Sequence, residues 1–419
     1  MTVTECMEYI HKTKWLGSKP GLSRTRELLG LLGNPQDSLR FIHIVGTNGK
    51  GSTAAMLSEI LKRAGYRVGT FVSPYIVSFN ERIQVGGEPI PDESLAAIVE
   101  KVRVFADRMQ DPPTEFELIT AVGFLYFLEC GCDIVVLEAG MGGALDSTNV
   151  INAPLVSVFT SIGLDHREQL GDTVSESART KAGILKEGSA AVFYGEEEEA
   201  LPVLREECQK KQIPLVIPDR TKLAVKECGI TGGVFDYKRL LGVKVALAGI
   251  HQIYNAVTVI ETVFLLNEKG FSVSERALRE GLAAVKWPAR FEILSEDPIV
   301  IFDGAHNING ATALAENMRS FFGKKKVTVL MGVMADKEHG EMLKLIAPFT
   351  KRLFAVTPGN PRALVAQALA EEASLCGIPA QAVTLDAAGM KTVRGTLKKT
   401  DVLLIMGSLY MYGDILPLV

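Results

Sequence analysis

The sequence predicts an α/β protein in which mainly parallel sheets are covered by helices. Short apolar runs rich in β-branched residues alternate with stretches of helical spacing, and this alternation is typical of parallel sheets. The first run, 41–45, ends at a glycine and is followed by helical spacing over 52–64. The composition agrees, because 47% hydrophobic and 22% charged residues are usual for a globular protein with large cores.

The strands are expected in two series. A helix should begin near Thr4 and Glu5, before the first strand. The remaining buried strands of the first series are expected at 67–72, 133–138, 155–160, 190–194 and 214–217. A second series follows Trp287, at 299–303, 326–331, 352–356 and 402–406.

This restart predicts two domains, 1–291 and 292–419, because the chain of 419 residues exceeds the size of one typical core. The stretch 287–298 is the expected hinge. Open α/β sheets bind ligands at the carboxyl ends of their strands, so we expect a site between the domains.

Charge and composition exclude several classes of protein. The formal net charge of −4 provides no basic surplus for binding a nucleic-acid backbone. No apolar run approaches the ~20 residues that span a bilayer, so no membrane segment is expected. The N-terminus does not have the pattern of a secretory signal, and the six cysteines lack the spacing of a zinc site. We therefore expect a cytoplasmic protein with reduced thiols.

A glycine-rich segment follows the first strand: Gly46-Thr47-Asn48-Gly49-Lys50-Gly51-Ser52. Between a strand and a helix, backbone N–H groups and the helix dipole can hold phosphate oxygens. Lys50 would reach the β- and γ-phosphates of ATP, and Ser52 would offer its hydroxyl to Mg²⁺. The spacing departs from the general phosphate loop, since two residues separate Gly46 from Gly49 and Gly51 precedes Ser52. A structural turn is the alternative.

The loop, spelled GTNGKGST, resembles that of the folylpolyglutamate synthase and dihydrofolate synthase family, within the Mur-ligase-like ATP ligases. Segments along the chain from about residue 20 to the C-terminus agree. They are FNERIQ at 79–84, EAGMGGALDSTN at 138–149, LDH at 164–166, TKAGI at 180–184, GIHQIYN at 249–255, WPAR at 287–290, DGAHN at 303–307 and GSLY at 407–410. The resemblance implies an N-terminal P-loop ATPase domain with a mainly parallel sheet and a smaller, Rossmann-like C-terminal glutamate-ligase domain.

Candidate metal ligands are indicated both by the chemistry of the residues and by the family resemblance. Glu138 ends a predicted buried strand, where a lone carboxylate is costly unless it is paired or binds a cation, so we interpret it as a Mg²⁺ ligand. A helix or turn cap is the alternative. The resemblance adds Ser73 near the first Mg²⁺ and His166 at a second, although imidazole is an unusual ligand for Mg²⁺. It also implies that CO₂ carbamylates Lys181, for which an ordinary surface lysine is the alternative.

Both predicted domains contain candidate residues for binding the nucleotide and for the reaction centre. His251 and Asn255 lie one helical turn apart, and Asn255 is the better candidate for contacting ATP. Arg290 could hold a phosphate with its planar guanidinium, and the resemblance places it on ATP. It also places Asp303 and His306 at the nucleotide and reaction centre. Structural roles are the alternative for Arg290, Asp303 and His306.

Four further residues are candidates for binding the other substrates. Lys337 and Ser408 resemble positions that hold the carboxylates of the incoming amino acid. Phe116 could stack on a pterin and Asp146 could accept hydrogen bonds from it, the alternatives being a core phenylalanine and a turn cap. The chain departs from the family at three positions, Ala144, Thr180 and Tyr75.

The implied reaction is ligation of L-glutamate to a folate, to dihydropteroate or to both, through an acyl phosphate, with ADP and phosphate released. The implied enzyme acts as a monomer on small molecules. A Mur-type ligase of peptidoglycan precursors is one alternative. A P-loop regulatory ATPase is another, and it would hydrolyse ATP without regard to glutamate or folate.

Overall fold

The computed structural model describes residues 1–12, 21–195 and 197–419, and the chain divides into two compact units. Unit 1 consists of Met1–Leu223 and Tyr254–Val285, and unit 2 of Ala224–Ile253 and Lys286–Val419. The domain boundary between residues 291 and 292 stays a prediction. Each unit is described by itself below.

Unit 1 is built on an eight-stranded sheet of order β4-β3-β2-β5-β1-β6-β7-β8. Its strands are β1 (Phe41–Val45), β2 (Val68–Phe71), β3 (Ile83–Val85), β4 (Glu88–Pro89), β5 (Ile134–Glu138), β6 (Val156–Phe159), β7 (Ala190–Phe193) and β8 (Leu215–Val216). All neighbours from β2 to β8 pair in parallel, while β3 and β4 form an antiparallel edge. Every residue of β1, β5, β6 and β7 is buried, as expected for parallel strands covered on both faces.

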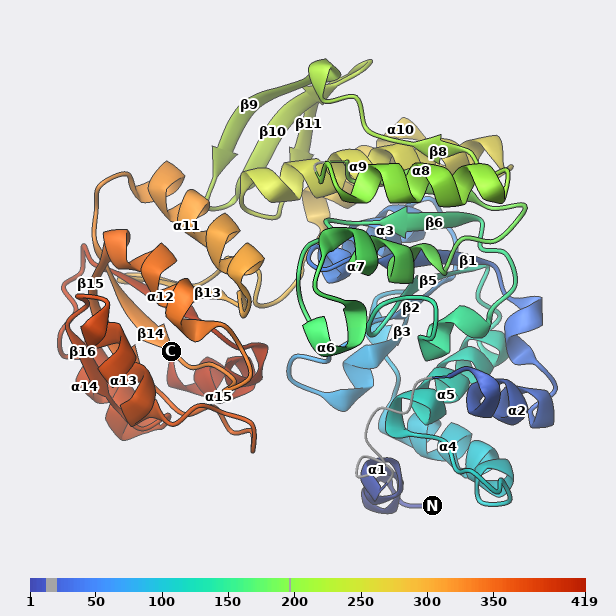
Figure 1. Cartoon of the computed structure of the whole chain (residues 1–419), viewed down its shortest axis with the longest axis horizontal. Helices are drawn as coiled ribbons and strands as arrows, with labels where there is room; N and C mark the ends of the chain where they lie inside the picture. Colours follow the sequence, from blue (N-terminus) through green and yellow to red (C-terminus); the bar gives the residue numbers. More distant parts are fainter. Residues whose placement is uncertain (13–20, 196) are drawn as a thin grey trace. The chain divides into compact units, whose positions relative to one another are not determined.

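Helices cover this sheet, and several pack in pairs: α10 on α3, α4 on α5 and α7 on α8 (Figure 1). Their bounds are α1 (Val3–Lys12), α2 (Ser23–Leu31), α3 (Lys50–Arg63), α4 (Asp92–Ala106), α5 (Glu115–Glu129), α6 (Arg167–Leu170), α7 (Val174–Ala182), α8 (Ala200–Lys210), α9 (Ile250–Glu268) and α10 (Glu275–Ala284). The cap of α5 is reciprocal: Glu117 N donates to Thr114 Oγ1, and Thr114 N donates to Glu117 Oε2.

Unit 2 contains a six-stranded sheet of order β12-β13-β17-β14-β15-β16. Its strands are β12 (Glu292–Glu296), β13 (Ile299–Asp303), β14 (Val327–Met331), β15 (Thr350–Ala355), β16 (Ala380–Ala382) and β17 (Val402–Met406). All pairs are parallel except β12 with β13. The register aligns Asp303 with Met406 and Met406 with Met331, so β13, β17 and β14 end at one edge.

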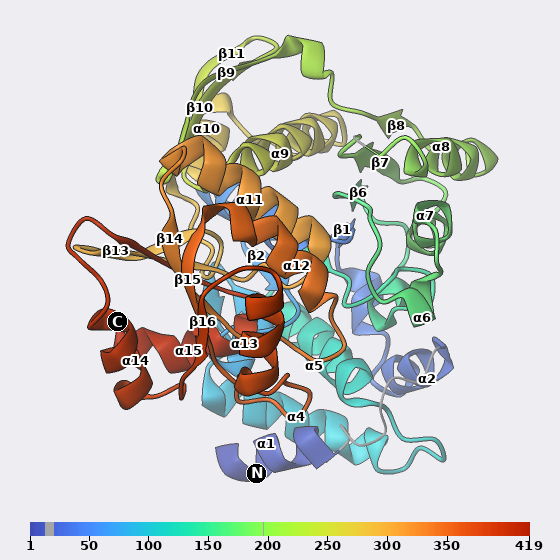
Figure 2. The ribbon, with the colours of Figure 1, turned by 60° about the vertical axis from the view of Figure 1, so that its left-hand side comes forward.

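The helices of unit 2 include α11 and α12, which pack together (Figure 2). Their bounds are α11 (Ile308–Phe322), α12 (His339–Ile346), α13 (Ala366–Leu375), α14 (Ala387–Arg394) and α15 (Tyr412–Ile415). A separate three-stranded sheet has the order β11-β10-β9 and consists of β9 (Leu223–Gly229), β10 (Gly232–Tyr237) and β11 (Leu240–Val245). The predicted α/β class with parallel sheets is confirmed, and the edge strand β8 lies within the strand expected at 214–217. The three-stranded sheet and the strands β3, β4, β12 and β16 were not anticipated.

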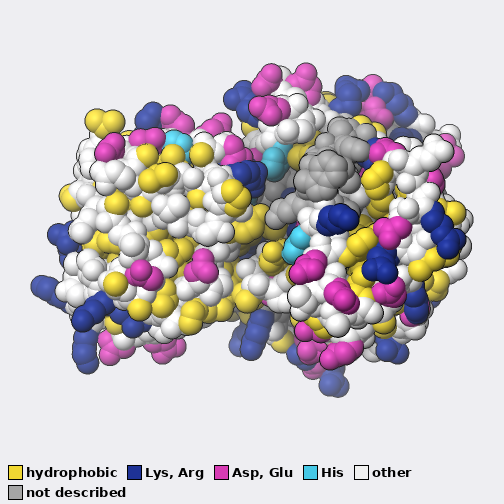
Figure 3. Space-filling model, turned by 90° about the horizontal axis from the view of Figure 1, so that it is seen from below, with side chains coloured by type: hydrophobic (Ala, Val, Ile, Leu, Met, Phe, Trp, Pro, Cys, Tyr) yellow, Lys and Arg dark blue, Asp and Glu magenta, His cyan; other side chains and the backbone are white. Residues whose placement is uncertain are grey.

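The surface carries both signs of charge. Acidic and basic side chains are interspersed over the face that Figure 3 presents. Within the described ranges, no helix has the length and apolar composition that crossing a membrane requires. The six cysteines are free thiols.

Candidate active site

The glycine-rich loop joins β1 to α3 and is fixed to the segment after β6. Thr47 makes two hydrogen bonds with Gly163: its Oγ1 accepts from Gly163 N and donates to Gly163 O, both at 2.9 Å. Asn48 forms an isolated bridge with Ser161, whose Oγ donates to Asn48 O at 3.3 Å. These contacts set the loop's backbone at the N-terminus of α3, the geometry that binds phosphate.

The close packing of this loop explains the glycine at position 49. Gly49 caps α3 with a φ of 88°, and a Cβ atom there would lie 2.9 Å from Asn255 Oδ1. Lys50 Nζ donates to the carbonyl oxygens of Gly46 at 3.1 Å and Thr47 at 3.2 Å, which holds the ammonium over the loop. Ser52, in the first turn of α3, is buried. The structure thus brings Asn255 to the loop.

Glu138 and Ser73 meet where β5 ends. Glu138 is the last residue of β5, and its side chain is buried. Ser73 N donates to Glu138 Oε2 at 3.4 Å, and an Arg82 Nη1 donates to Ser73 Oγ at 3.0 Å. Within the described ranges no three His, Cys, Asp or Glu side chains form a metal cluster. A carboxylate with hydroxyl groups still fits Mg²⁺, which takes oxygen ligands and completes its shell with water and phosphate.

Lys181 is buried at the end of α7, with a side chain only 1% exposed. Its Nζ donates to Ser177 Oγ at 2.8 Å, one helical turn earlier. Burial, and next the positive charge of Lys50, lowers the pKa of Lys181 to about 7, while Asp165 acts in the opposite direction. A large fraction of Lys181 is therefore a neutral amine near neutral pH, and neutral amines react with CO₂.

His166 differs from the other metal candidates because its side chain is 46% exposed. It precedes α6 in the left-handed conformation, with a φ of 51°. The His166 backbone N–H donates to Asp165 Oδ1 at 2.9 Å, so Asp165 fixes the turn that presents the imidazole. The ring can reach solvent or a ligand without rearrangement of a core.

The two folate candidates lie together in unit 1. The Phe116 ring meets Phe71 edge-on at 5.9 Å between centroids, and a Cβ at Gly140 would lie 2.6 Å from Phe116 Cζ. Asp146 is buried, and its Oδ2 accepts from Met141 N at 2.8 Å. Asp146 also caps a short 3₁₀ helix, so the turn-capping role considered from the sequence is present. Phe116 therefore rests on the loop that Asp146 closes.

In unit 2, Arg290, Asp303, His306 and His251 are brought together. A Cβ at Gly304 would lie 2.7 Å from an Arg290 Nη1. Burial raises the pKa of Asp303, Arg290 opposes the rise, and the carboxylate accepts backbone hydrogen bonds. His306 Nδ1 lies 2.8 Å from Gly304 O. Burial, and next Arg290, lowers the pKa of His251 to about 4, so His251 is neutral at physiological pH.

Lys337 and Ser408 follow adjacent strands of unit 2. Lys337 lies in the segment after β14, and Ser408 follows β17, next to β14 in the sheet. Ser408 is buried, and its Oγ accepts from Tyr410 N at 3.2 Å. Asp303 ends β13 on the other side of β17. All three residues therefore stand at the carboxyl edge of one sheet, where α/β proteins bind ligands.

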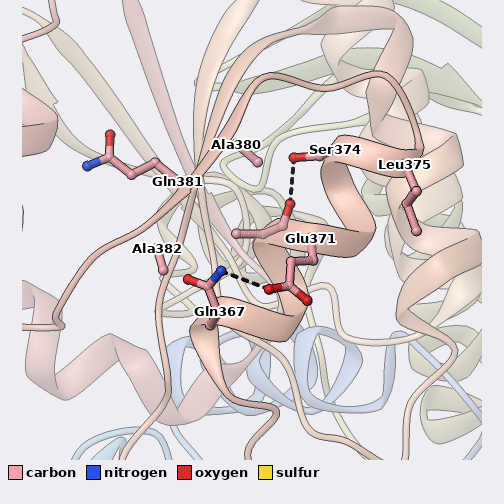
Figure 4. Close-up of a pocket in the computed structure, with 8 residues that line it drawn as sticks. Gln367, Glu371, Ser374, Leu375, Ala380, Gln381 and Ala382 are labelled. Atoms are coloured by element: carbon pink, nitrogen blue, oxygen red, sulfur yellow. Dashed lines mark hydrogen bonds between the residues drawn. The ribbon is translucent and has the colours of Figure 1, made fainter.

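An open pocket between α13 and β16 contains none of these residues (Figure 4). The polar side chains that α13 contributes are bonded within this helix: Gln367 Nε2 donates to Glu371 Oε1, and Ser374 Oγ donates to Ala370 O. Its wall is completed by Leu375, Ala380, Gln381 and Ala382. The candidate site residues described above lie elsewhere.

Sequence reasoning missed three neighbours of the candidate residues. Ser177 bonds Lys181, Asp165 lies close enough to shift its pKa, and Arg82 donates to Ser73. The spacing of Ser177 and Lys181 by one turn of a helix could have identified the first pair. Asp165 and Arg82 both fall inside motifs that the sequence had already singled out, but their partners come from other segments.

The departures from the family pattern have defined places. Ala144 N donates to Thr180 O at 2.9 Å, so two of the altered positions touch through backbone. The Tyr75 ring lies under the guanidinium of Arg82, 5.1 Å from its centroid. All three positions belong to unit 1.

Comparisons with known proteins match both parts of the chain. Residues 44–263 match the Mur ligase middle domain and residues 289–409 the Mur ligase glutamate ligase domain. A dihydrofolate synthase/folylpolyglutamate synthase from Bacillus subtilis is 37% identical over 98% of this chain and 97% of its own length.

Solved structures agree. Mycobacterium tuberculosis folylpolyglutamate synthase complexed with ADP and AMPPCP has a TM-score of 0.89 at 30% identity, covering 99% of this chain and 98% of that one. Escherichia coli FolC in complex with DHPP and ADP has a TM-score of 0.88 at 27% identity, covering 100% and 97%. The chain belongs to the folylpolyglutamate synthase and dihydrofolate synthase family of Mur ligases.

Proposed function

We propose that this protein joins the amine of L-glutamate to a carboxylate of a folate, of dihydropteroate or of both, in an ATP-dependent reaction. The observation that carries the proposal is the loop 46–52, fixed between β1 and α3 with Asn255 against it, in a chain whose whole length matches ligases of this reaction. The γ-phosphoryl group passes to the carboxylate oxygen and ADP leaves. The amine of glutamate then attacks the acyl carbon and phosphate leaves.

The loop is proposed to hold the phosphates of ATP. Backbone N–H groups at the start of α3 point along the helix axis, where the helix dipole favours negative charge. The Lys50 ammonium, held over Gly46 and Thr47 carbonyl oxygens, has a short path to the β- and γ-phosphates. It would neutralise charge that spreads over the phosphoryl oxygens during transfer. Asn48, Gly51 and Asn255 complete the proposed ATP contacts.

Ser52, Ser73 and Glu138 are proposed to hold a Mg²⁺ ion at the phosphates. They supply the oxygen donors that this ion prefers, and Glu138 brings a buried negative charge that a cation would balance. Bound there, Mg²⁺ would neutralise phosphate charge as the acyl phosphate forms. His166 is proposed as a ligand of a second ion.

Lys181 is proposed to be carbamylated. Its neutral amine nitrogen would attack the carbon of CO₂ and release one proton, which converts a buried amine into a carbamate anion. The depressed pKa of Lys181 supports the first step, because protonated lysine has no lone pair for the attack. The carbamate would add an oxygen ligand for the second ion.

Unit 2 is proposed to supply two sets of groups. Arg290, Asp303 and His306 would act at the nucleotide and the reaction centre; the electrostatic interaction of Arg290 with Asp303 and the contact of His306 with Gly304, next to Asp303, support this. Lys337 and Ser408, at the carboxyl edge of the sheet, would bind the carboxylates of glutamate. On the folate side, Phe116 would stack on the pterin and Asp146 would accept its hydrogen bonds. We propose that the protein is a monomer.

The reaction can be tested directly. The protein is incubated with ATP, Mg²⁺ and L-glutamate, and with either dihydropteroate or tetrahydrofolate, while phosphate release and product mass are followed. The expected product is heavier than its precursor by a glutamyl residue, and Lys50→Ala should lose it. No product from either substrate would overturn the proposal.

The same assay separates the alternatives. A regulatory ATPase would release phosphate at a rate that does not depend on glutamate or on a folate. A ligase of peptidoglycan precursors would form product only with a UDP-sugar peptide. Omitting glutamate and exchanging the acceptor therefore identify which of the three activities is present.

A further inference from the structure

A buried chain of hydrogen bonds links β1 to the loop after β5. His43, in the middle of β1, is fully buried, and its Nε2 lies 2.9 Å from Thr148 Oγ1. Thr148 is also fully buried, and its hydroxyl lies 2.5 Å from Asp146 Oδ1. Thr148 N donates to the same oxygen at 3.0 Å. Three polar side chains are thus placed in series inside unit 1.

The direction of these bonds follows from the count of protons. An ionised Asp146 can only accept, so the single hydroxyl proton of Thr148 points to Asp146, and Thr148 Oγ1 must accept from His43 Nε2–H. Burial, and next the charge of Lys186, lowers the pKa of His43 to about 3, which keeps the ring neutral with one N–H. His43 therefore carries its proton on Nε2.

The reverse direction leaves a donor unpaired. If Asp146 were protonated and donated to Thr148, the hydroxyl would donate to His43 Nε2, and the ring proton would move to Nδ1. His43 Nδ1 is buried and has no hydrogen-bond partner among residues 1–12, 21–195 and 197–419. Buried N–H groups without partners are rarer and more costly than unused acceptor sites. Burial raises the pKa of Asp146, but the hydrogen bonds from Thr148, Met141 and Gly140 oppose that rise. The chain of bonds therefore favours Asp146 as a carboxylate.

Asp146 connects this chain to the folate candidates. Its other oxygen accepts from Met141 N, which closes the loop over Gly140. The Phe116 ring packs on Gly140 so closely that a Cβ there would lie 2.6 Å from Phe116 Cζ. A change in the charge or position of Asp146 would therefore alter two features at once. One is its ability to accept hydrogen bonds, and the other is the loop on which the Phe116 ring rests.

We propose that His43 is a positioning residue for the pterin-bearing substrate: acting through the Thr148 hydroxyl, its Nε2–H fixes Asp146 as a hydrogen-bond acceptor. This inference rests on the proposed function, in which Asp146 contacts that substrate. A carboxylate held in this way recognises a heterocycle that presents adjacent amino and ring N–H groups. His43 itself would not touch the ligand.

The test removes the middle group of the series, the Thr148 hydroxyl, in one variant and keeps it in another. Thr148→Val removes the hydroxyl with almost no change of shape, whereas Thr148→Ser keeps it. The matched control is Ser157→Ala, because Ser157 is fully buried on β6 and pairs with His43 in the register. Steady-state KM for the pterin substrate, KM for ATP, kcat and the thermal midpoint are measured for each protein.

A hydrogen bond to a charged group is strong enough that Thr148→Val should raise KM for the pterin substrate by about tenfold. KM for ATP should stay within about twofold, and Thr148→Ser should recover most of the loss. His43→Gln, whose amide can still donate to Thr148, should be closer to wild type than His43→Leu.

Two results would overturn the inference. One is an unchanged KM for the pterin substrate in Thr148→Val. The other is an increase that Ser157→Ala reproduces, since that would mark a general disturbance of the sheet. If Thr148→Val does not fold, the pair His43→Gln and His43→Leu decides the same question. Failure of the proposed function is distinct, because wild-type protein would then form no product at all.

Discussion

Gly49 and Asn255 touch where α3 begins: a Cβ atom on Gly49 would lie 2.9 Å from Asn255 Oδ1 and 3.2 Å from its Nδ2. Gly49 also has a φ of 88°, a backbone angle that residues with a side chain rarely adopt. The phosphate loop and the amide brought to it from α9 therefore depend on each other. A side chain at this position would disturb both at once.

We expect Gly49→Ala to raise KM for ATP by at least about tenfold, because displacing a contact by even 1 Å at a binding site is costly. The matched control is Gly65→Ala, at the other end of α3. Gly65 has a φ of 92°, but a Cβ there meets nothing within 4 Å. Both variants carry backbone strain, and only Gly49→Ala adds the clash. Equal ATP affinities would show that the contact with Asn255 has no role.

A substitution at Gly140 tests whether the position of the Phe116 ring matters for binding the pterin substrate. A Cβ at Gly140 would approach Phe116 Cζ to 2.6 Å, so Gly140→Ala should push the ring away from its place beside Phe71. We expect KM for the pterin substrate to rise several-fold, while KM for ATP stays close to wild type. Gly30→Ala serves as the control, since its Cβ meets nothing within 4 Å. A rise in both KM values would contradict a separate folate site.

The sequence predicted those parts of the fold in which apolar residues dominate a segment. The apolar runs that became β5 and β13 stop at Glu138 and Asp303, and both carboxylates do end their strands. A buried strand between helices leaves little choice of residue, since both of its faces are covered. The ends of such strands could therefore be located from hydrophobicity alone.

The missed strands are half-exposed. Strand β9 (Leu223–Gly229) is mostly open to solvent, and β12 (Glu292–Glu296) has no buried residue. Their sequences mix charged and apolar residues and lack a continuous run. Antiparallel edge strands are specified by their neighbours more than by their own composition. Spacing within one segment could not reveal them.

The candidate site shows the same limit. The roles proposed for the loop 46–52 follow from its own sequence, but the partners of its residues come from distant segments: Gly163 for Thr47 and Asn255 for Gly49. His43 appeared in the sequence as one polar residue in an apolar strand. Only the structure joins it to Thr148 and Asp146.

Arg24 and Glu117 form a buried ion pair that should contribute strongly to stability. Arg24 donates to both carboxylate oxygens of Glu117, at 3.0 and 2.9 Å, and the side chains are 9% and 3% exposed. Arg24→Met leaves Glu117 without this cation, and breaking a buried pair costs about 3–5 kcal/mol. We expect a loss of that size in urea unfolding.

The control is the exposed pair Lys101–Glu129, with N–O distance 2.7 Å and side chains 54% and 40% exposed. Lys101→Met should cost less than about 1 kcal/mol, because water screens such pairs. If both variants lost the same stability, burial would not be what makes the Arg24 pair matter.

Burial of Lys181 should make stability depend on pH. Its pKa is about 7 in the folded protein against 10.5 as the ordinary value, so between these pH values the unfolded chain binds the proton and the folded chain releases it. Stability therefore rises with pH across this window and is lowest below about pH 7. Lys181→Met removes the dependence. The amount by which the unfolding free energy of Lys181→Met exceeds that of the wild type should shrink by roughly 3 kcal/mol between about pH 6.5 and about pH 9.5.

The measurement is urea unfolding of both proteins at the two pH values, in buffer free of CO₂ and Mg²⁺, because a carbamate would reverse the charge of the group. Lys399→Met is the control, since its side chain is 88% exposed and should add no pH dependence. A constant difference between Lys181→Met and wild type would contradict a neutral buried amine. The chemistry proposed for Lys181 requires that amine, so the same result would also remove the reason to expect its reaction with CO₂.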